Sequence, residues 1–308
     1  MEGKIKYLER KEIDVEKWDR CIETAGDGLI YSYSFYLDAM AKHWDGLVLN
    51  NYEAVMPLTW KKKWGIRYLY QPAFIQQGGI FFSEPLSESI QQSFIDRAFS
   101  HFRFAEITLN FLNKTIDPFN SLAGVRNNFI LALNKSYTEI YSGYDTVAVK
   151  NLKRAKNAGL QYSVIHEFLP VLKLYESLYA ERLPYFSKPD FTNFGIICKK
   201  LFGENNLVVR NVSGDKNELL AAAILLKDNN RLYNLISCVS PEGKLAQANY
   251  FLYDQLIQEF CDSQYLLDFE GSDVKGIADF YNRFSPQNEP YPFIKMNHLP
   301  PILKLFKR

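Results

Sequence analysis

The sequence has few residues of the kinds that form disulfides or metal sites, and it lacks a long hydrophobic run. Its 308 residues include four cysteines and four histidines, and neither set shows the close spacing typical of a metal site or a disulfide framework. The cysteines are therefore expected to be reduced and mostly structural. The longest purely apolar run, Leu219 to Leu226, is far shorter than the roughly 20 residues of a membrane-spanning helix. We expect no metal and no transmembrane segment.

The chain also lacks an excess of charge of either sign, since its formal net charge is +1. A near-neutral protein has no whole-molecule field that gathers nucleic acid, so no DNA partner is expected, although a local basic patch stays open. The first residues, Met1 to Lys6, lack the apolar core of a signal peptide, which makes the cytoplasm the expected location. A chain of this length that is 47% hydrophobic predicts a globular protein of two domains.

Apolar periodicity predicts a similar succession of strands and helices in the two halves of the chain. In the first half, we expect helices over 14–23, 35–43 and 86–102, and strands over 47–49, 54–60, 66–70 and 105–111. In the second half, we expect strands over 160–165, 207–212, 219–226, 231–238 and 265–269, and helices over 168–182, 191–202 and 248–260. The repeated order indicates a duplicated fold, joined between Leu133 and Tyr144, where polar residues and glycine interrupt the apolar pattern.

The most specific pattern lies between Gln264 and Phe284. A short apolar strand is followed by the turn residues 270–273 and then by an aromatic stripe at helical spacing. Asp268, Glu270 and Asp273 are expected to gather at the carboxyl end of the strand, where open α/β sheets place their ligands. The same residues also fit an ordinary strand-to-helix turn with Ser272 as the helix cap.

This stretch resembles a signature of the FemAB-like and BioF-like acyltransferases of the GNAT superfamily, which combines an apolar strand, Asp-Phe, a Gly-Ser turn and an aromatic-rich helix. Asp268 to Ser272 and Gly276 to Phe280 match it, and a second match is the strand Phe129 to Leu133 followed by the basic helix Lys150 to Leu160. The resemblance implies an α/β (α+β) fold of two tandem GNAT-like domains, each a mixed, largely antiparallel sheet flanked by helices. The expected domains are residues 1–134 and 135–308, with the active site in the second.

The resemblance implies transfer of an acyl or aminoacyl group to an amine of a small molecule or a peptidoglycan precursor in the cell envelope. Such a reaction needs a base for the amine, stabilisation of the oxyanion and an acid for the leaving group. Glu270 is the expected base and Tyr281 the acid or orienting hydroxyl, while Asn249 is expected to polarise the carbonyl group. Asp268 and Ser272 are expected to bind the substrate beside Glu270.

The loop from Ser240 to Asn249 stands where GNAT enzymes hold the pyrophosphate of coenzyme A. Gly243 is the expected contact to the ligand, but Leu245 occupies a position where the family pattern has a small residue. The donor therefore stays open between acyl-CoA and aminoacyl-tRNA. An ordinary surface loop also fits this segment.

A basic cluster on one expected helix contains Lys153 and Arg154, and it is suited to the phosphates of a nucleotide-linked substrate or of tRNA. A solvated helix face explains the same charges. Arg182 is a further candidate for holding an anion, because neighbouring tyrosines can orient its guanidinium group.

A second function from another class fits the same fold. The imperfect pyrophosphate loop favours a binding protein that has kept the GNAT fold without catalysis and that holds a peptide or a saccharide. Fold resemblance alone does not separate this function from an acyltransferase.

Overall fold

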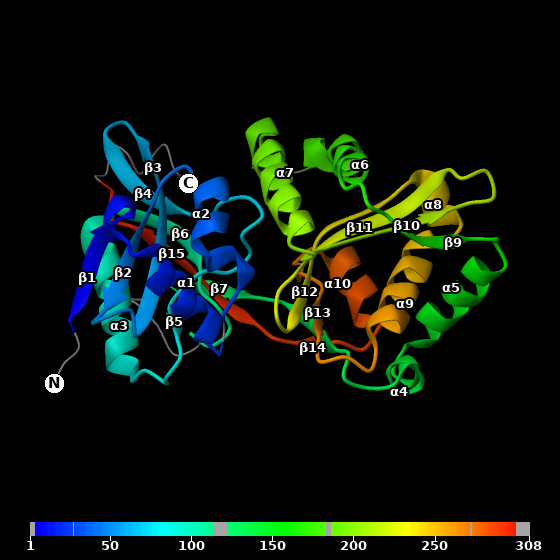
Figure 1. Cartoon of the computed structure of the whole chain (residues 1–308), viewed down its shortest axis with the longest axis horizontal. Coiled ribbons are helices and arrows are strands. Elements are labelled where there is room, and N and C mark those ends of the chain that lie inside the picture. Colours follow the sequence, from blue (N-terminus) through cyan, green and yellow to red (C-terminus); the bar gives the residue numbers. More distant parts are fainter. Residues whose placement is uncertain (1–3, 27, 114–121, 183–185, 272, 300–308) are drawn as a thin grey trace. The chain divides into compact units, whose positions relative to one another are not determined.

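The computed structural model describes residues 4–26, 28–113, 122–182, 186–271 and 273–299. The chain divides into two compact units (Figure 1), Met1–Arg126 with Pro290–Arg308, and Asn127–Glu289. Each unit is a mixed sheet flanked by helices, which confirms the predicted fold class. No helix among the described residues is long and apolar enough to cross a membrane.

Unit 1 contains a sheet in the order β1-β2-β3-β4-β6-β15-β7, with β5 beside β3. Its neighbours are antiparallel except for the parallel pair β4 and β6. The strands are β1 Ile5–Glu9, β2 Trp44–Leu49, β3 Ala54–Lys63, β4 Ile66–Tyr70, β5 Phe81–Phe82, β6 Phe104–Thr108, β7 Leu122–Arg126 and β15 Tyr291–Asn297. The helices are α1 Val15–Thr24, α2 Ser34–Met40 and α3 Glu88–His101, with short 3-10 turns at Arg10–Glu12 and Ile30–Ser32.

Unit 2 contains a sheet in the order β14-β8-β13-β12-β11-β10-β9. Its strands are β8 Phe129–Ala132, β9 Gln161–Val164, β10 Leu207–Ser213, β11 Leu219–Lys227, β12 Arg231–Val239, β13 Leu266–Asp268 and β14 Gln287–Asn288. Its helices are α4 Tyr137–Ser142, α5 Thr146–Lys156, α6 Leu169–Tyr179, α7 Lys188–Gly203, α8 Pro241–Leu245, α9 Ala248–Phe260 and α10 Lys275–Asn282, and a 3-10 turn spans Ala180–Arg182.

Strand β11 lies between β12 and β10 in the sheet of unit 2, and its residues from Leu220 to Leu226 are all buried. A strand that is covered on both faces has a continuous run of apolar residues in its sequence, without alternation between apolar and polar residues. Helices α4, α5, α9 and α10 supply residues to the core on one face, and α6 contacts β11 and β12 while α7 contacts β10. Figure 1 shows α6 and α7 on the opposite side of these strands from α9.

The observed division differs from the predicted domains at both ends of the second unit. Strand β8 belongs to unit 2 and pairs with β13, whereas β15 pairs with β6 and β7 of unit 1. The chain therefore returns to unit 1 after Glu289, although we predicted that residues 135–308 form one domain. Pairing between strands so far apart in the sequence leaves no local pattern by which it can be predicted.

Several elements of the structure were not predicted from the sequence. These are β1, β5, β7, β14 and β15 among the strands, and α4 and α8 among the helices. Helix α7 begins at Lys188, three residues earlier than predicted, because Ser187 and Asp190 form a capping box. The predicted helix cap Ser272 lies outside the described residues, and α10 begins at Lys275 with Val274 at its N-cap position.

Candidate active site

A pocket opens in unit 2 where two parallel strands part. Strands β12 and β13 pair only from Arg231 with Leu266 to Tyr233 with Asp268. Beyond that point β12 continues to Val239 while β13 ends. A pocket of about 840 Å³ lies there, lined by side chains from the free part of β12 and by Phe269, Glu270 and Gly271 after β13. Its volume is in the range of small-molecule sites.

A β-bulge in β12 marks the point where the strands part. Ile236 pairs with Ile224 and Tyr233 with Leu226, so Asn234 and Leu235 together face one residue of β11. Bulges are enriched next to active sites, where they redirect a side chain. Here the bulge places Asn234 in the pocket lining, with a side chain that is only 3% exposed.

Asn234 is tied to two tyrosines of the pocket. Its Nδ2 group donates to the hydroxyl oxygen of Tyr253 at 2.7 Å and is 3.4 Å from that of Tyr281. Its Oδ1 atom is buried and has no hydrogen-bond partner among the described residues. Asn234 was not among the residues predicted for the site, and its signal in the sequence is a lone amide within the mostly apolar strand Leu232 to Ile236.

The turn after β13 holds Glu270 at the pocket. Glu270 and Gly271 both have left-handed backbone conformations, with φ of 61° and 47°. The N–H of Glu270 donates to Asp268 Oδ1 at 2.8 Å. A left-handed conformation is costly for a residue with a side chain, and such residues are often found at functional sites. The left-handed conformations of Glu270 and Gly271 confirm the turn that the sequence predicts after the strand.

Gly271→Val should destabilise unit 2 by at least about 2 kcal/mol, because two penalties combine there. A Cβ atom on residue 271 would lie 2.0 Å from the carbonyl oxygen of Asn127, and valine is strained at positive φ. Hydrogen exchange of the amides of β8 and β13 would report the loss. Gly276→Val is the matched control, because a Cβ at that position meets no atom within 4 Å. Equal protection in both variants would contradict the described turn.

Asp268 lies beside this turn but does not line the pocket. Its carboxylate is 1% exposed and pairs with Arg231 at 2.7 Å, and it accepts a hydrogen bond from Asn128 Nδ2. Glu289 is a second, more exposed partner of Arg231, at 3.4 Å. The structure thus turns Asp268 to the interior, where it fixes the backbone of Glu270, and not toward a substrate as we predicted.

Burial controls the titration of the pocket side chains. Burial raises the pKa of Glu270 well above its ordinary value, because a low-dielectric environment disfavours the charged carboxylate. The neighbouring Asp268 carboxylate does not cause this shift, because it is paired with Arg231. Burial also raises the pKa of Tyr281 well above its ordinary value and that of Tyr253 to about 12. Both phenols therefore stay protonated near neutral pH.

The pocket also contains a cysteine, Cys238, from β12. It is 2% exposed, and burial raises its pKa to about 12. The thiolate is the nucleophilic form of cysteine, so Cys238 is unsuited to form a covalent intermediate.

Of the residues predicted for the site, the structure brings three into the pocket: Glu270, Tyr281 and Asn249. Asn249 lies in the first turn of α9. Arg182 ends the 3-10 turn after α6, and the structure describes its backbone alone. Ser272 lies outside the described residues.

Lys153 and Arg154 do not line the pocket. Both are exposed on α5, whose buried residues Ala148, Leu152 and Ala155 form the opposite face. This arrangement is that of an amphipathic helix with a solvated basic face.

Gly243 serves packing and does not line the pocket. It lies in the short helix α8, and a Cβ on it would be 2.2 Å from the carbonyl oxygen of Leu220 in β11. The Ser240 hydroxyl accepts the Gly243 N–H at 2.9 Å, so the helix start is capped by its own side chain. The expected contact between Gly243 and a ligand is thus replaced by a contact between α8 and the sheet.

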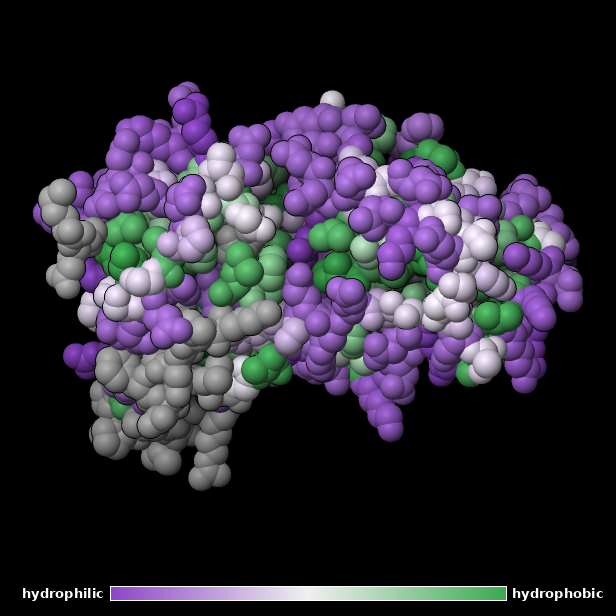
Figure 2. Space-filling view, turned by 90° about the horizontal axis from the view of Figure 1, so that it is seen from below, coloured by the Kyte–Doolittle hydropathy of each residue, from purple (hydrophilic) through white to green (hydrophobic). Residues whose placement is uncertain are grey.

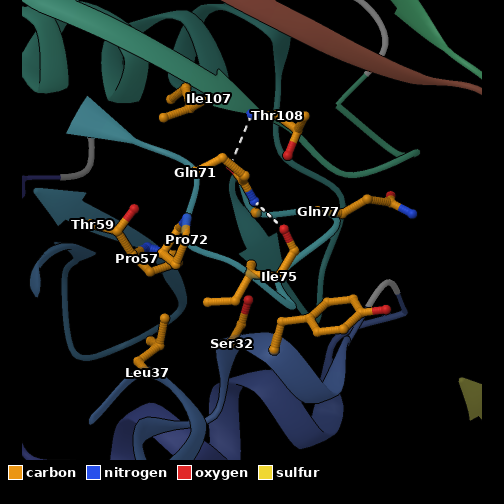
Figure 3. Close-up of a pocket in the computed structure, with 13 residues that line it drawn as sticks. Ser32, Leu37, Pro57, Thr59, Gln71, Pro72, Ile75, Gln77, Ile107 and Thr108 are labelled. Carbon is orange, nitrogen blue, oxygen red and sulfur yellow. Dashed lines mark hydrogen bonds between the residues drawn. The ribbon is translucent and has the colours of Figure 1, made fainter. Parts of the chain in front are cut away.

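Unit 1 holds a much smaller cavity near the end of β4, which Figure 3 shows. Its volume is about 20 Å³, enough for about one water molecule. Gln71 crosses it, accepting the Thr108 N–H at 3.1 Å and donating to the Ile75 carbonyl at 2.8 Å. The side chain of Gln77 accepts the Phe111 N–H. These amides hold the loop together, so we place the candidate site in unit 2.

The two units, each a mixed sheet with one parallel pair of strands, define a tandem fold of the GNAT class. FemX has this fold: it is 12% identical, with a TM-score of 0.68, and the match covers 98% of this chain and 100% of FemX. A protein of unknown function from Bacteroides thetaiotaomicron is 9% identical, with a TM-score of 0.62 over 96% of this chain and 100% of that one.

A third similar structure is the C-terminal domain assigned to a lysylphosphatidylglycerol synthetase from Agrobacterium fabrum. It is 12% identical, with a TM-score of 0.53 over 95% of this chain and 94% of that one. The sequence itself matches no protein-family model and no curated protein. The FemAB-like resemblance is therefore confirmed at the level of the fold.

Proposed function

We propose that the protein transfers an acyl or aminoacyl group from an activated donor to an amine, forming an amide. The observation that carries this proposal is the position of Glu270, a carboxylic acid of raised pKa, in the pocket where β12 and β13 part. A base whose pKa lies nearer neutrality is suited to take a proton from an ammonium group. The folds shared with FemX and with the lysylphosphatidylglycerol synthetase domain support transfer chemistry.

In the proposed reaction the Glu270 carboxylate accepts a proton from the acceptor ammonium. The neutral nitrogen then attacks the carbonyl carbon of the donor, so that a C–N bond forms and the bond to the leaving sulfur or oxygen breaks. The surplus proton of the attacking nitrogen passes to the leaving group through the Tyr281 hydroxyl, and Glu270 releases its proton to water. The Tyr281 hydroxyl, kept protonated by burial, donates a proton or a hydrogen bond to the leaving group. No covalent enzyme intermediate is required.

The oxyanion of the tetrahedral intermediate needs hydrogen-bond donors that are already in place. Past Tyr233, the edge of β12 that faces the pocket has no paired strand among the described residues. Its backbone N–H groups, together with Asn249 from α9, are the donors that we assign to this role.

The donor is either an acyl-CoA or an aminoacyl-tRNA. GNAT enzymes hold the pyrophosphate of acyl-CoA at the segment that corresponds to α8. Here α8 has only five residues and its start is capped by Ser240, so this segment does not favour acyl-CoA as the donor. The basic face of α5 is compatible with a tRNA donor. Both donors are cytoplasmic molecules, which agrees with the expected location. The proposed acceptor is an amine of a small molecule or of a cell-envelope precursor.

Mass spectrometry of reaction mixtures tests the proposal. The protein is incubated with acyl-CoAs or with charged tRNAs, each together with a mixture of primary amines, and amide products are sought. We expect an amide with one donor class, formed in proportion to protein concentration. Absence of amide with both donor classes would instead favour the non-catalytic binding protein.

A further inference from the structure

The pocket of unit 2 is lined by few charged side chains. Its charged lining residues among those described are Lys244, Glu270 and Arg283. Lys244 is exposed on α8, and Arg283 pairs with Asp145 at 2.9 Å. The other polar groups of the lining include the Glu270 carboxyl, the amide of Asn234 and the hydroxyl groups of Tyr253 and Tyr281. The Glu270 carboxylate and the Oδ1 atom of Asn234 can accept hydrogen bonds from a ligand, and the tyrosine hydroxyls can donate them.

The Oδ1 atom of Asn234 is a buried hydrogen-bond acceptor that a ligand could satisfy. Its N–H groups face the hydroxyl oxygens of Tyr253 and Tyr281, which leaves Oδ1 as a buried acceptor without a partner among the described residues. A buried acceptor that stays unsatisfied costs about 1–3 kcal/mol. A ligand with an N–H group would remove that cost.

Aromatic rings form much of the wall around these two acceptors. Phe269 and Tyr281 are stacked with ring centroids 4.7 Å apart, and Tyr253 meets Tyr281 edge to face at 5.9 Å. Tyr175, Tyr179, Tyr250 and Phe280 also line the pocket. Ring faces attract a cation within about 6 Å, and they also pack against methylene groups.

Apolar side chains continue to the outer part of the pocket. Val274 and Ile277 line it and are 62% and 44% exposed. Apolar residues also reach the surface of unit 2 on the face drawn in Figure 2. Exposed apolar residues beside a pocket commonly mark a binding surface. Here they would contact the apolar part of a ligand whose polar group lies at Glu270 and Asn234.

We propose that this pocket selects a primary amine at the end of an apolar chain, and that Asn234 Oδ1 and the Glu270 carboxylate receive its N–H groups. The alkyl part then lies between the aromatic walls and the apolar rim of Val274 and Ile277. An alkylamine or the side chain of lysine has this chemistry. The inference rests on the proposed function, because it assigns the pocket to the acceptor of the transfer reaction.

Binding of three matched probes tests the inference with the wild-type protein. The probes are n-hexylamine, n-hexanol and hexyltrimethylammonium, which share the chain but differ in charge and in N–H donors. By calorimetric titration we expect n-hexylamine to bind at least about tenfold more tightly than either of the others, as hydrogen bonds to a charged group imply. Similar affinities for all three would overturn the inference and leave an apolar channel suited to the chain of the donor.

Variants of Asn234 test its role separately. Asn234→Leu should abolish most of the preference for n-hexylamine over hexyltrimethylammonium, whereas Asn234→Asp, which keeps an acceptor, should retain it. Asn211→Leu is the matched control, because Asn211 Oδ1 is also buried and has no partner within the described part of the chain, but it lies on β10 and does not line the pocket. A preference unchanged in Asn234→Leu would remove Asn234 from recognition. If that variant does not fold, the probe comparison in the wild type decides.

The outcomes separate this inference from the proposed function. Selective binding of n-hexylamine without amide formation from any donor would contradict the transferase and support the amine site. Amide formation on hydrophilic amines, with turnover unaffected by Asn234→Leu, would support the transferase and overturn the inference.

Discussion

Glu270→Gln should lower the rate of amide formation on the order of a hundredfold or more while the fold is retained. Glutamine keeps the shape of the side chain but cannot accept the proton of the acceptor ammonium. The measurement is kcat/KM with the donor and the amine that give product. Glu242→Gln is the matched control, because Glu242 is exposed on α8 and does not line the pocket. Unchanged turnover in Glu270→Gln would remove Glu270 from the mechanism.

The stability of the same variant separates a base from a structural partner. The folded-state pKa of Glu270 is raised, so the stability associated with its neutral form is fully present below about pH 4.5 and is lost as pH rises through the folded pKa. Glu270→Gln cannot ionise and avoids that loss. Above neutral pH we therefore expect the melting temperature of Glu270→Gln to be no lower than that of the wild type. If Glu270 instead formed a structural ion pair, the variant would melt at a lower temperature.

Asp268→Asn should lower the free energy of unfolding of unit 2 by about 3–5 kcal/mol, as expected when one member of a buried ion pair is removed. Burial alone would lower the pKa of Arg231, but the neighbouring Asp268 carboxylate raises it. In the variant, the Arg231 guanidinium keeps the Glu289 carboxylate, at 3.4 Å, as a charged partner. Hydrogen exchange within unit 2 measures the change. Asp279→Asn on the exposed face of α10 is the control.

A charge-free double variant checks the cause of this loss. Arg231→Met combined with Asp268→Leu removes both buried charges and should recover part of the stability lost in Asp268→Asn. If Asp268→Asn were as stable as wild type, the pair would contribute nothing measurable. The role that we assign to Asp268, holding the Glu270 backbone, would then be unsupported.

Much of unit 2 could be predicted because its sequence patterns are local. The apolar run of β11 and the aromatic stripe of α9 and α10 have the periods of a buried strand and of amphipathic helices. The turn at Gly271 was predictable because glycine tolerates positive φ. These patterns placed Glu270 at the end of a strand, which is where the structure has it.

The remaining features depend on tertiary structure that no local pattern reports. The position of Asn234 follows from a bulge, which is defined by the register between β11 and β12. We expected Asp268 and Glu270 to gather at a ligand site, but a left-handed turn follows Asp268, and its carboxylate pairs with Arg231 in the interior. Likewise, the pairing of β15 with unit 1 joins strands that are distant in sequence.

The most direct test of the central claim is a titration of the Glu270 carboxyl group by NMR. Glutamate labelled with 13C at the side-chain carboxyl is incorporated, and the Glu270 signal is assigned by its absence in Glu270→Gln. We expect this signal to titrate above the ordinary value of about 4.5 and to titrate at lower pH with saturating n-hexylamine, because a bound ammonium favours the carboxylate. A signal that titrates at the ordinary value, or that n-hexylamine leaves unchanged, would contradict the claim that Glu270 faces an amine in this pocket.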